Sequence, residues 1–193
     1  MLTDLLVSKV RVKILQLFCA QPNRIFHVRD IVRRVSEEIN AVRRELARLE
    51  KAGLLASEWR ANRRYYSLRS DYIFYQDLLS LINKTTGLGG EIVKNRNKLG
   101  KIKYAAMSGT FVRNKPAGAA EVDLLVVGNI VVPQLAAIVR EEEAKREREI
   151  NYTVMTEEEF SFRKRRRDPF VLDILAKPRV MLLGDEEEML KVI

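Results

Sequence analysis

Apolar residues recur at helical spacing in three segments of the first 50 residues. The segments cover residues 5–18, 27–35 and 39–49. Intervals of three and four residues place side chains on one face of an α-helix, so the pattern predicts three amphipathic helices. Ser36 is a residue type that caps helix N-termini, and we expect it to begin the third helix. Gly53 is expected to end that helix.

The next segment has the alternation of two β-strands. Residues 54–60 and 63–68 are rich in aromatic and apolar side chains and predict a β-hairpin with its turn around Ala61 and Asn62. The flanking Arg60 and Arg63 leave the exact length of the loop open. The order of helix, short helix, longer helix and hairpin is that of a winged helix-turn-helix. In that arrangement the third helix lies in the major groove of DNA and the hairpin is the wing.

The side of the third helix opposite its apolar stripe carries side chains that suit DNA. Since Asn bonds adenine bidentately and Arg bonds guanine, base contacts are expected from Asn40, Arg43 and Arg44. Phosphate contacts are expected from Arg48 and Lys51. The tip of the hairpin is expected to lie over the neighbouring backbone or minor groove, through Arg60, Asn62, Arg63 and Arg64.

Charge is distributed unevenly along the chain. Residues 1–70 hold 15 lysines and arginines against 7 acidic residues, a formal charge of +8, whereas residues 71–193 hold 20 and 19, a charge of +1. A clustered positive field attracts phosphate backbones. The asymmetry therefore favours double-stranded DNA as the partner of the N-terminal part, with a solvated basic surface as the alternative.

The segment INAVRRELARLEKAGLLASEWRANRRYYSL resembles the recognition helix and wing of winged-helix repressors of the arsenical-resistance type. The matching positions are Leu46, Leu49, Gly53, Leu54, Tyr65, Tyr66, Ser67 and Leu68. The resemblance implies DNA binding. The metal-sensing cysteines of many such repressors are missing, so no cofactor is expected to be required for DNA binding. A winged helix that joins proteins together is the alternative.

The segment SDYIFYQDLLSLINKT follows the wing and has a broad apolar face. That face either packs between two domains or pairs with its copy in a homodimer, which would suit a reader of two half-sites. Three glycines in TTGLGG mark a boundary. The predicted domains are therefore a winged-helix domain at 1–70, a connector and dimerisation helix at 71–88, and a nucleotidyltransferase-like domain at 89–193.

The remaining chain alternates between the two periodicities. Helices are expected over residues 90–100, from Pro133, after a capping box of Thr156 and Glu159, and from Asp168–Pro169. Strands are expected at 102–107, 122–128, 150–155 and 179–184. This alternation predicts an α/β domain with a small mixed sheet, so that the whole chain is of the α+β class.

One motif in this part carries candidate chemistry. Gly109 and Thr110 are followed, after ten residues, by Glu121, Val122 and Asp123 at the start of a strand. This spacing resembles the signature of the polymerase-beta-like minimal nucleotidyltransferases. The resemblance implies that Gly109 and Thr110 bind a nucleoside triphosphate and that Glu121 and Asp123 hold Mg²⁺, because carboxylates at i and i+2 share one face of a strand.

Three departures from the signature favour a scaffold without catalysis. Thr110 replaces a serine, Glu121 replaces the first aspartate, and the neutral Asn151 stands where a third carboxylate is expected. Mg²⁺ tolerates displaced oxygen ligands poorly. The predicted function is thus a sequence-specific DNA-binding transcriptional regulator. The alternative is an active, Mg-dependent, antitoxin-like nucleotidyltransferase that modifies a protein or RNA, binds DNA and has a toxin-like protein partner.

Three further patterns concern the surface and the location of the protein. The basic run at 162–168 is expected to be a solvated helix end, with a phosphate or nucleic-acid contact as the alternative. The chain lacks a signal-peptide pattern and an apolar run of about 18 residues, so a cytoplasmic protein without membrane contact is expected. The single cysteine, Cys19, lies on an apolar stripe and is expected in the core.

Overall fold

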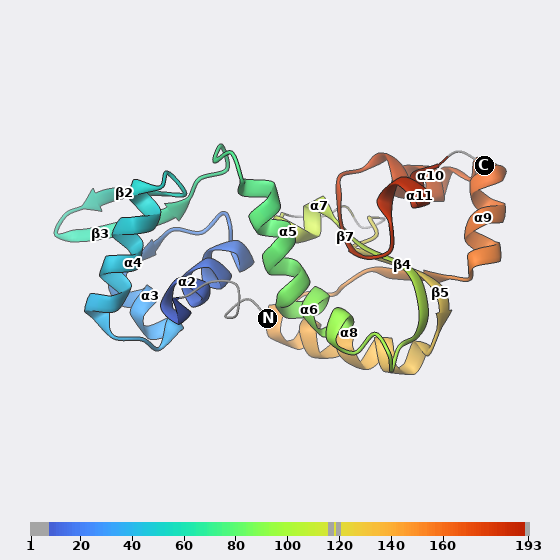
Figure 1. Ribbon diagram of the computed structural model, residues 1–193, viewed down its shortest axis with the longest axis horizontal. Coiled ribbons are helices and arrows are strands. Elements are labelled where there is room, and N and C mark those ends of the chain that lie inside the picture. Colours follow the sequence, from blue (N-terminus) through green and yellow to red (C-terminus); the bar gives the residue numbers. More distant parts are fainter. Residues whose placement is uncertain (1–7, 116–117, 119–120, 192–193) are drawn as a thin grey trace. The chain divides into compact units, whose positions relative to one another are not determined.

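The computed structural model describes residues 8–115, 118 and 121–191 (Figure 1). These residues form ten helices and two small sheets, so the predicted α+β class is confirmed. The chain divides into two compact units between Ile82 and Asn83, inside the segment that the sequence assigns to a connector. Within the described residues, no helix combines the length and the apolar character needed to cross a bilayer.

Three helices form the core of the first unit: α2 (Lys9–Ala20), α3 (Val28–Val35) and α4 (Ile39–Lys51). Their apolar stripes face one another, as the periodicity predicts, and bury Ile14, Phe18, Ile31, Val42 and Leu46 almost completely. Cys19 is also buried, and this burial raises the pKa of its thiol to about 12. The cysteine therefore acts as a small core residue, as expected.

The start of α4 differs from the sequence prediction. Ser36 does not cap α4; it ends α3 in a left-handed conformation (φ 52°), and its N–H donates to the carbonyl of Val32. Glu38 caps α4 instead, with carboxylate oxygens that accept from the N–H groups of Asn40 and Ala41 at 2.8 and 2.9 Å. These bonds lower the pKa of Glu38. The prediction was wrong because the tight turn between the helices requires a left-handed residue at position 36.

A three-stranded antiparallel sheet completes the first unit. Strand β3 (Arg63–Leu68) lies between β2 (Leu55–Arg60) and the short β1 (Phe26–His27). The turn of the predicted hairpin falls at residues 61 and 62, as expected. The ring of His27 accepts a hydrogen bond from the N–H of Asp30 and so caps α3.

The second unit is built on a four-stranded mixed sheet in the order β6-β5-β4-β7. Only β5 and β6 are parallel, and the other two pairs are antiparallel, which confirms the predicted mixed sheet. The strands are β4 (Gly100–Ser108), β5 (Leu124–Ile130), β6 (Tyr152–Met155) and β7 (Arg179–Leu183).

Helices cover both faces of this sheet (Figure 1). On one side lie α6 (Gly87–Lys94) and α8 (Val132–Arg146); on the other lie α9 (Glu157–Arg165), α10 (Pro169–Ala176) and α11 (Glu186–Leu190). The helix expected over residues 90–100 ends at Lys94, because the chain must turn before β4. The sequence reading missed α11 and the one-turn helix α7 (Gly109–Val112), which are too short to show a periodicity. Helix α5 (Tyr75–Thr85) spans the boundary between the units.

Candidate functional site

The outer face of α4 carries two arginines that form no ion pair within the described part of the chain. The opposite face is buried through Val42, Leu46 and Leu49, which leaves Arg43 and Arg44 exposed. Among the described residues neither guanidinium has a carboxylate within 4 Å. A guanidinium offers a planar set of N–H donors, so this face can bind anions or base edges.

The other predicted positions of α4 lie on the same exposed surface but differ in their contacts. Asn40 and Lys51 are exposed. Arg48 pairs with the buried Glu45 at 3.1 Å, and Glu45 also accepts from Arg11 at 2.8 Å. Arg48 is therefore partly neutralised by a direct ion pair, whereas no described carboxylate lies within 4 Å of the guanidinium of Arg43 or Arg44.

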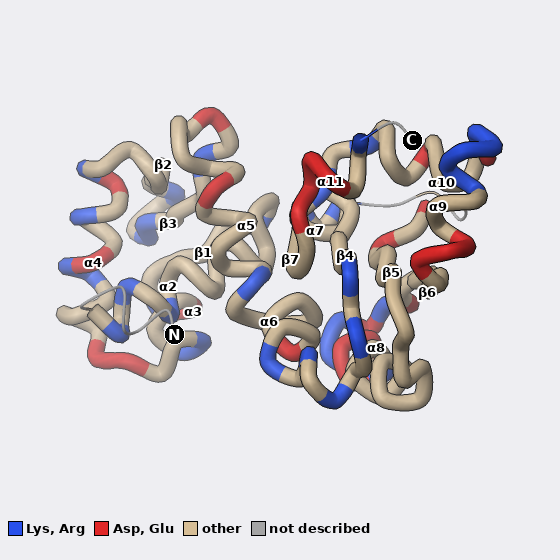
Figure 2. The backbone as a smooth tube through the Cα atoms, turned by 45° about the vertical axis from the view of Figure 1, so that its right-hand side comes forward, with Lys and Arg blue, Asp and Glu red and all other residues tan. Residues whose placement is uncertain are grey.

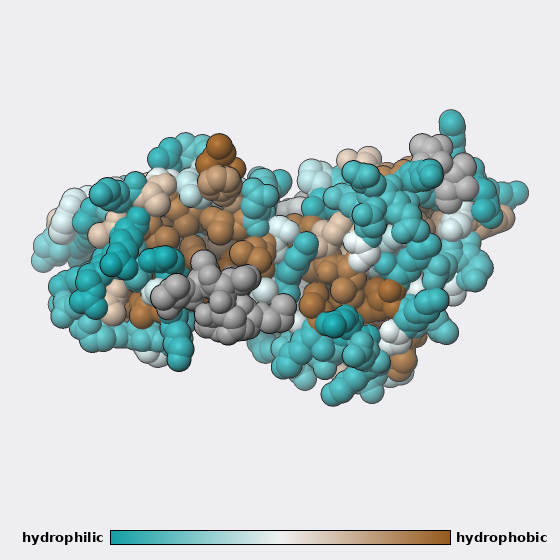
Figure 3. Space-filling model, in the orientation of Figure 1, coloured by the Kyte–Doolittle hydropathy of each residue, from teal (hydrophilic) through white to brown (hydrophobic). Residues whose placement is uncertain are grey.

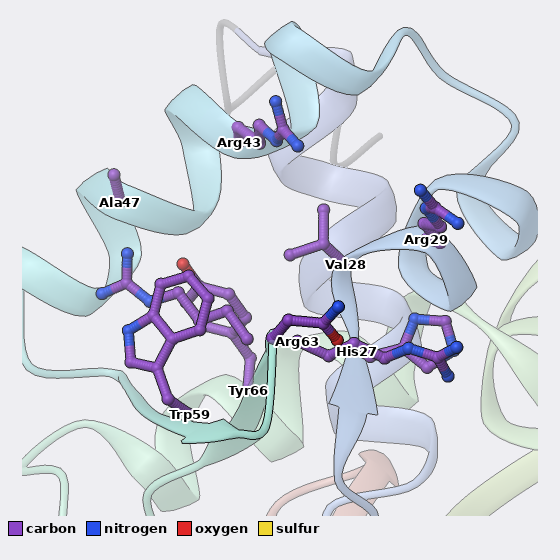
Figure 4. A pocket seen from close by; sticks show the side chains of 10 residues that line it. His27, Val28, Arg29, Arg43, Ala47, Trp59, Arg63 and Tyr66 are labelled. Carbon is purple, nitrogen blue, oxygen red and sulfur yellow. The ribbon is translucent and has the colours of Figure 1, made fainter.

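A concave pocket of about 470 Å³ lies between α4 and the hairpin (Figure 4). Helix α4 contributes Arg43 and Ala47, the hairpin contributes residues from both strands, and β1 with α3 contributes the remaining wall. The lining side chains are His27, Val28, Arg29, Arg43, Ala47, Trp59, Asn62, Arg63, Arg64 and Tyr66. Four of them are arginines and none is acidic, so the pocket suits an anion.

Arg64 has a different role from the other hairpin arginines. Its guanidinium donates to both carboxylate oxygens of Glu50, each at 2.9 Å, and its Nε donates to the hydroxyl of Ser57 at 3.1 Å. It also lies over the rings of Trp59 and Tyr66. Since Glu50 is in the last turn of α4, this bidentate pair holds the hairpin against the helix.

The tip of the hairpin is more open. Asn62 and Arg63 are exposed, and among the described residues Arg63 forms no ion pair. Arg60 pairs with Glu58 and lies over the ring of Tyr65 at 5.2 Å. Among the predicted hairpin cations, Arg63 is thus the one whose guanidinium has no carboxylate partner within the described residues.

The residues of this surface that were not predicted from the sequence include Arg29, Glu50 and Trp59. The side chain of Trp59 is 68 % exposed at the rim of the pocket. The sequence held a signal for the position of Trp59. Strict alternation along β2 places it on the same face of the strand as the buried Leu55. The contributions of Arg29 and Glu50 depend on tertiary packing and had no local signal.

Replacing Arg64 with alanine is expected to destabilise the first unit by about 1 kcal/mol, because a half-buried bidentate pair is lost. Arg63→Ala is the matched control, since its side chain forms no ion pair within the described structure, and it should leave the melting temperature unchanged. Calorimetric unfolding of both variants checks this. Equal melting temperatures for the two variants would contradict the positioning role of Arg64.

The acidic motif lies at the ends of three strands in the second unit. Asp123 is fully buried. One carboxylate oxygen accepts from Arg148 at 3.1 Å and the other accepts from the N–H of Asn151 at 3.1 Å. Burial raises the pKa of Asp123, although these two donors act in the opposite direction. The side chain thus joins β5 to the segment before β6.

Gly109 and Thr110 lie at the start of α7. The N–H of Gly109 donates to the carbonyl of Pro178 at 2.7 Å, and a Cβ on Gly109 would lie only 3.0 Å from that oxygen. The glycine therefore permits a close approach of two backbone segments. Thr110 is half-buried, and the helix is capped by the hydroxyl of Ser108, which accepts from the N–H of Phe111.

The two carboxylates of this motif, Glu121 and Asp123, differ in their surroundings. Glu121 is half-exposed and lines an open pocket of about 450 Å³ together with Asn151. Across the described residues no three His, Cys, Asp or Glu side chains lie close enough to share an ion. Mg²⁺ is usually held by one or two carboxylates together with waters and substrate phosphates. In the described structure both oxygens of Asp123 accept hydrogen bonds from Arg148 and Asn151.

No protein-family model matches the chain, and comparisons with curated proteins and with solved structures find no match either. The two resemblances read from the sequence therefore stay predictions.

Proposed function

We propose that the protein is a transcriptional regulator that binds a specific duplex DNA sequence through a winged helix-turn-helix in its first unit. The observation that carries the proposal is the acid-free basic pocket between α4 and the hairpin. Arg43 and Arg44 on the exposed face of α4, which form no ion pair with any described residue, support it.

The dimensions of the elements agree with this mode of binding. Helix α4 has 13 residues and is therefore about 20 Å long, enough to cross the major groove, which is about 12 Å wide. In the proposed complex Asn40, Arg43 and Arg44 contact base edges. The phosphate backbone beside the groove lies in the pocket, where Arg29 and Arg63 face it, and the tip of the hairpin reaches the next groove.

Selection of binding sites from random duplexes tests the proposal. A sequence-specific reader should enrich a short motif over successive rounds, and the motif should compete for binding far better than unrelated duplexes. Recovery of no enriched sequence would overturn the proposal, even if the protein bound DNA weakly.

We also propose that the protein binds DNA as a homodimer. Exposed apolar side chains gather where β3 leads into α5: Ile73 is 81 % exposed and Phe74 is also exposed. Figure 3 shows hydrophobic surface over this loop. Burying these side chains between two copies would remove apolar surface from water and place two recognition helices on one site.

The double variant Ile73→Asp, Phe74→Asp is expected to convert the dimer to a monomer and to weaken binding to a two-half-site operator by at least about tenfold. Sedimentation velocity reads the mass. Val132→Asp, at an exposed apolar position of α8, is the control and should leave the mass unchanged. A wild-type protein that sediments as a monomer at micromolar concentration would contradict the proposal.

For the second unit we propose a nucleotidyltransferase-like scaffold without catalysis. The supporting observation is the engagement of both Asp123 oxygens by Arg148 and Asn151. Incubation with labelled ATP, Mg²⁺ or Mn²⁺ and candidate RNA or protein substrates is expected to give no transfer that depends on Asp123. A labelled product that disappears in Asp123→Asn would show that the unit is an enzyme.

A further inference from the structure

A second basic surface lies at the end of α9, in the second unit (Figure 2). Residues 163–167 are five consecutive arginines and lysines. Arg163 pairs with Glu159 at 2.8 Å, and Lys164 donates to the carbonyl of Met189 at 2.6 Å. The other three, Arg165, Arg166 and Arg167, are exposed and form no ion pair within the described part of the chain. Their charge is available to a partner.

The backbone at Arg167 is unusual for an arginine. The residue has φ 53°, in the left-handed region. Its N–H donates to the carbonyl of Lys164 and the N–H of Asp168 donates to that of Arg163, which is the Schellman pattern that ends many helices. Glycine is the residue that adopts this position without strain. An arginine there is strained, as are Ser36, Ala61, Asn114 and Glu147 at similar φ, so the conformation marks the end of the helix and is not by itself evidence of a binding role.

Two exposed phenylalanines flank these arginines. Phe162 is 51 % exposed and Phe170 is 40 % exposed. The guanidinium carbon of Arg166 lies 5.1 Å from the centre of the Phe162 ring. We call the five residues the α9–α10 patch; they are Phe162, Arg165, Arg166, Arg167 and Phe170. Arg166 and Phe162 thus place a cationic and an aromatic group side by side, a combination that binds both phosphates and bases.

We propose that the α9–α10 patch binds single-stranded nucleic acid. The three arginines contact successive phosphates, and the exposed rings stack on bases. A single strand is favoured because its bases present free faces to the phenylalanines, whereas the bases of a duplex are stacked on each other. The surface is separate from the α4 pocket, so this proposal does not depend on sequence-specific duplex binding by the first unit.

Binding of the full chain to labelled single strands of about 16 nucleotides, DNA and RNA, tests the patch. The triple variant Arg165→Gln, Arg166→Gln, Arg167→Gly should bind at least about tenfold more weakly, and the slope of log K against log salt should fall in magnitude by about 2, since three phosphate contacts are lost. Phe162→Ala should weaken binding by about tenfold without changing the slope. The charge-matched control Lys98→Gln, Arg140→Gln, Lys145→Gln removes three exposed cations of the same unit and should bind nearly as the parent.

The variant Arg167→Gly distinguishes the contribution of the side chain to binding from its contribution to stability. Glycine relieves the left-handed strain, so the melting temperature should stay constant or rise while affinity for the single strand falls. Glu147→Gly is the matched control, because Glu147 has φ 52° at the end of α8. It should raise stability in the same way and leave affinity unchanged or slightly higher.

Three results would overturn the proposal: equal binding by the triple variant and the parent, equal losses in the triple variant and its control, or a loss confined to a duplex or to phosphatidylserine vesicles. Arg43→Ala, Arg44→Ala should keep its affinity for single strands. The proposal of duplex recognition is thus tested by the Arg43, Arg44 variant, and the proposal of single-strand binding by the Arg165, Arg166, Arg167 variant, so that either can fail without the other.

Discussion

The double variant Arg43→Ala, Arg44→Ala is expected to lose about 100-fold or more in affinity for the selected duplex. Each arginine that bonds a base edge contributes about 1–3 kcal/mol, and about 1.4 kcal/mol corresponds to a factor of ten. Both guanidinium groups lack an ion-pair partner in the described structure, so their removal leaves no buried charge behind. The loss should therefore appear in binding and not in the melting temperature.

Comparison with unrelated duplexes shows how the affinity is lost. If the two arginines contact bases, the variant should bind selected and unrelated sequences with similar affinity. If they contact only phosphates, both affinities should fall together and the salt slope should decrease by about 0.9 for each contact. Arg24→Ala, Arg33→Ala is the matched control, since it removes two exposed cations of the same unit away from the outer face of α4. Equal binding by the parent and the Arg43, Arg44 variant would contradict the proposed interface.

The substitution Arg148→Ala is expected to destabilise the second unit by about 2 kcal/mol at pH 7. Asp123 is fully buried, and removal of one partner of a buried ion pair leaves an uncompensated charge, a loss of about 3–5 kcal/mol in fully buried cases. The side chain of Arg148 is 30 % exposed, so water can replace it in part and the smaller value is expected. Hydrogen exchange of peptides that cover β5 and β6 reads this unit separately from the first.

Acidification should reduce this destabilisation. Burial already raises the pKa of Asp123 in the folded protein, and loss of the Arg148 guanidinium raises it further. The carboxyl of Asp123 thus has a higher pKa in the folded state than its ordinary value near 4 in the unfolded state, and the folded state binds the proton more tightly. The free energy of unfolding therefore increases as the pH falls from above the folded pKa towards 4. The difference between Arg148→Ala and the parent is therefore largest at pH 7 and smaller at pH 5.

Asp123→Asn provides the control for this cycle. In the Asp123→Asn background no charge remains to be compensated, so adding Arg148→Ala should cost less than about 1 kcal/mol and should show no dependence on pH between 5 and 7. A loss of equal size in both backgrounds would mean that Arg148 acts through packing, for which its contact with the ring of Phe111 is the candidate.

Sequence reasoning succeeded where the signal was local. The three helices of the first unit and the hairpin with its turn at residues 61 and 62 follow from periods of 3.6 and 2. It failed for the cap of α4, because Ser36 and Glu38 are both capable of capping and only the turn geometry selects between them. It could not detect α11, since five residues are too few for a periodic pattern.

The sequence by itself determined the α+β class, the order of most helices and strands and the exposed arginines of α4, since each depends on residues close together in the chain. The mixed sheet was expected from the alternation of strands and helices, but its pairs join distant segments, such as Ala105 with Leu183. Tertiary structure alone decided which polar groups are engaged. Arg64 lies against Glu50, 14 residues away, and Arg148 against Asp123, 25 residues away. Such pairs form only when packing of the apolar faces brings distant segments together, and the same packing leaves Arg43, Arg44 and the three arginines that follow Lys164 without an acidic partner in the described structure.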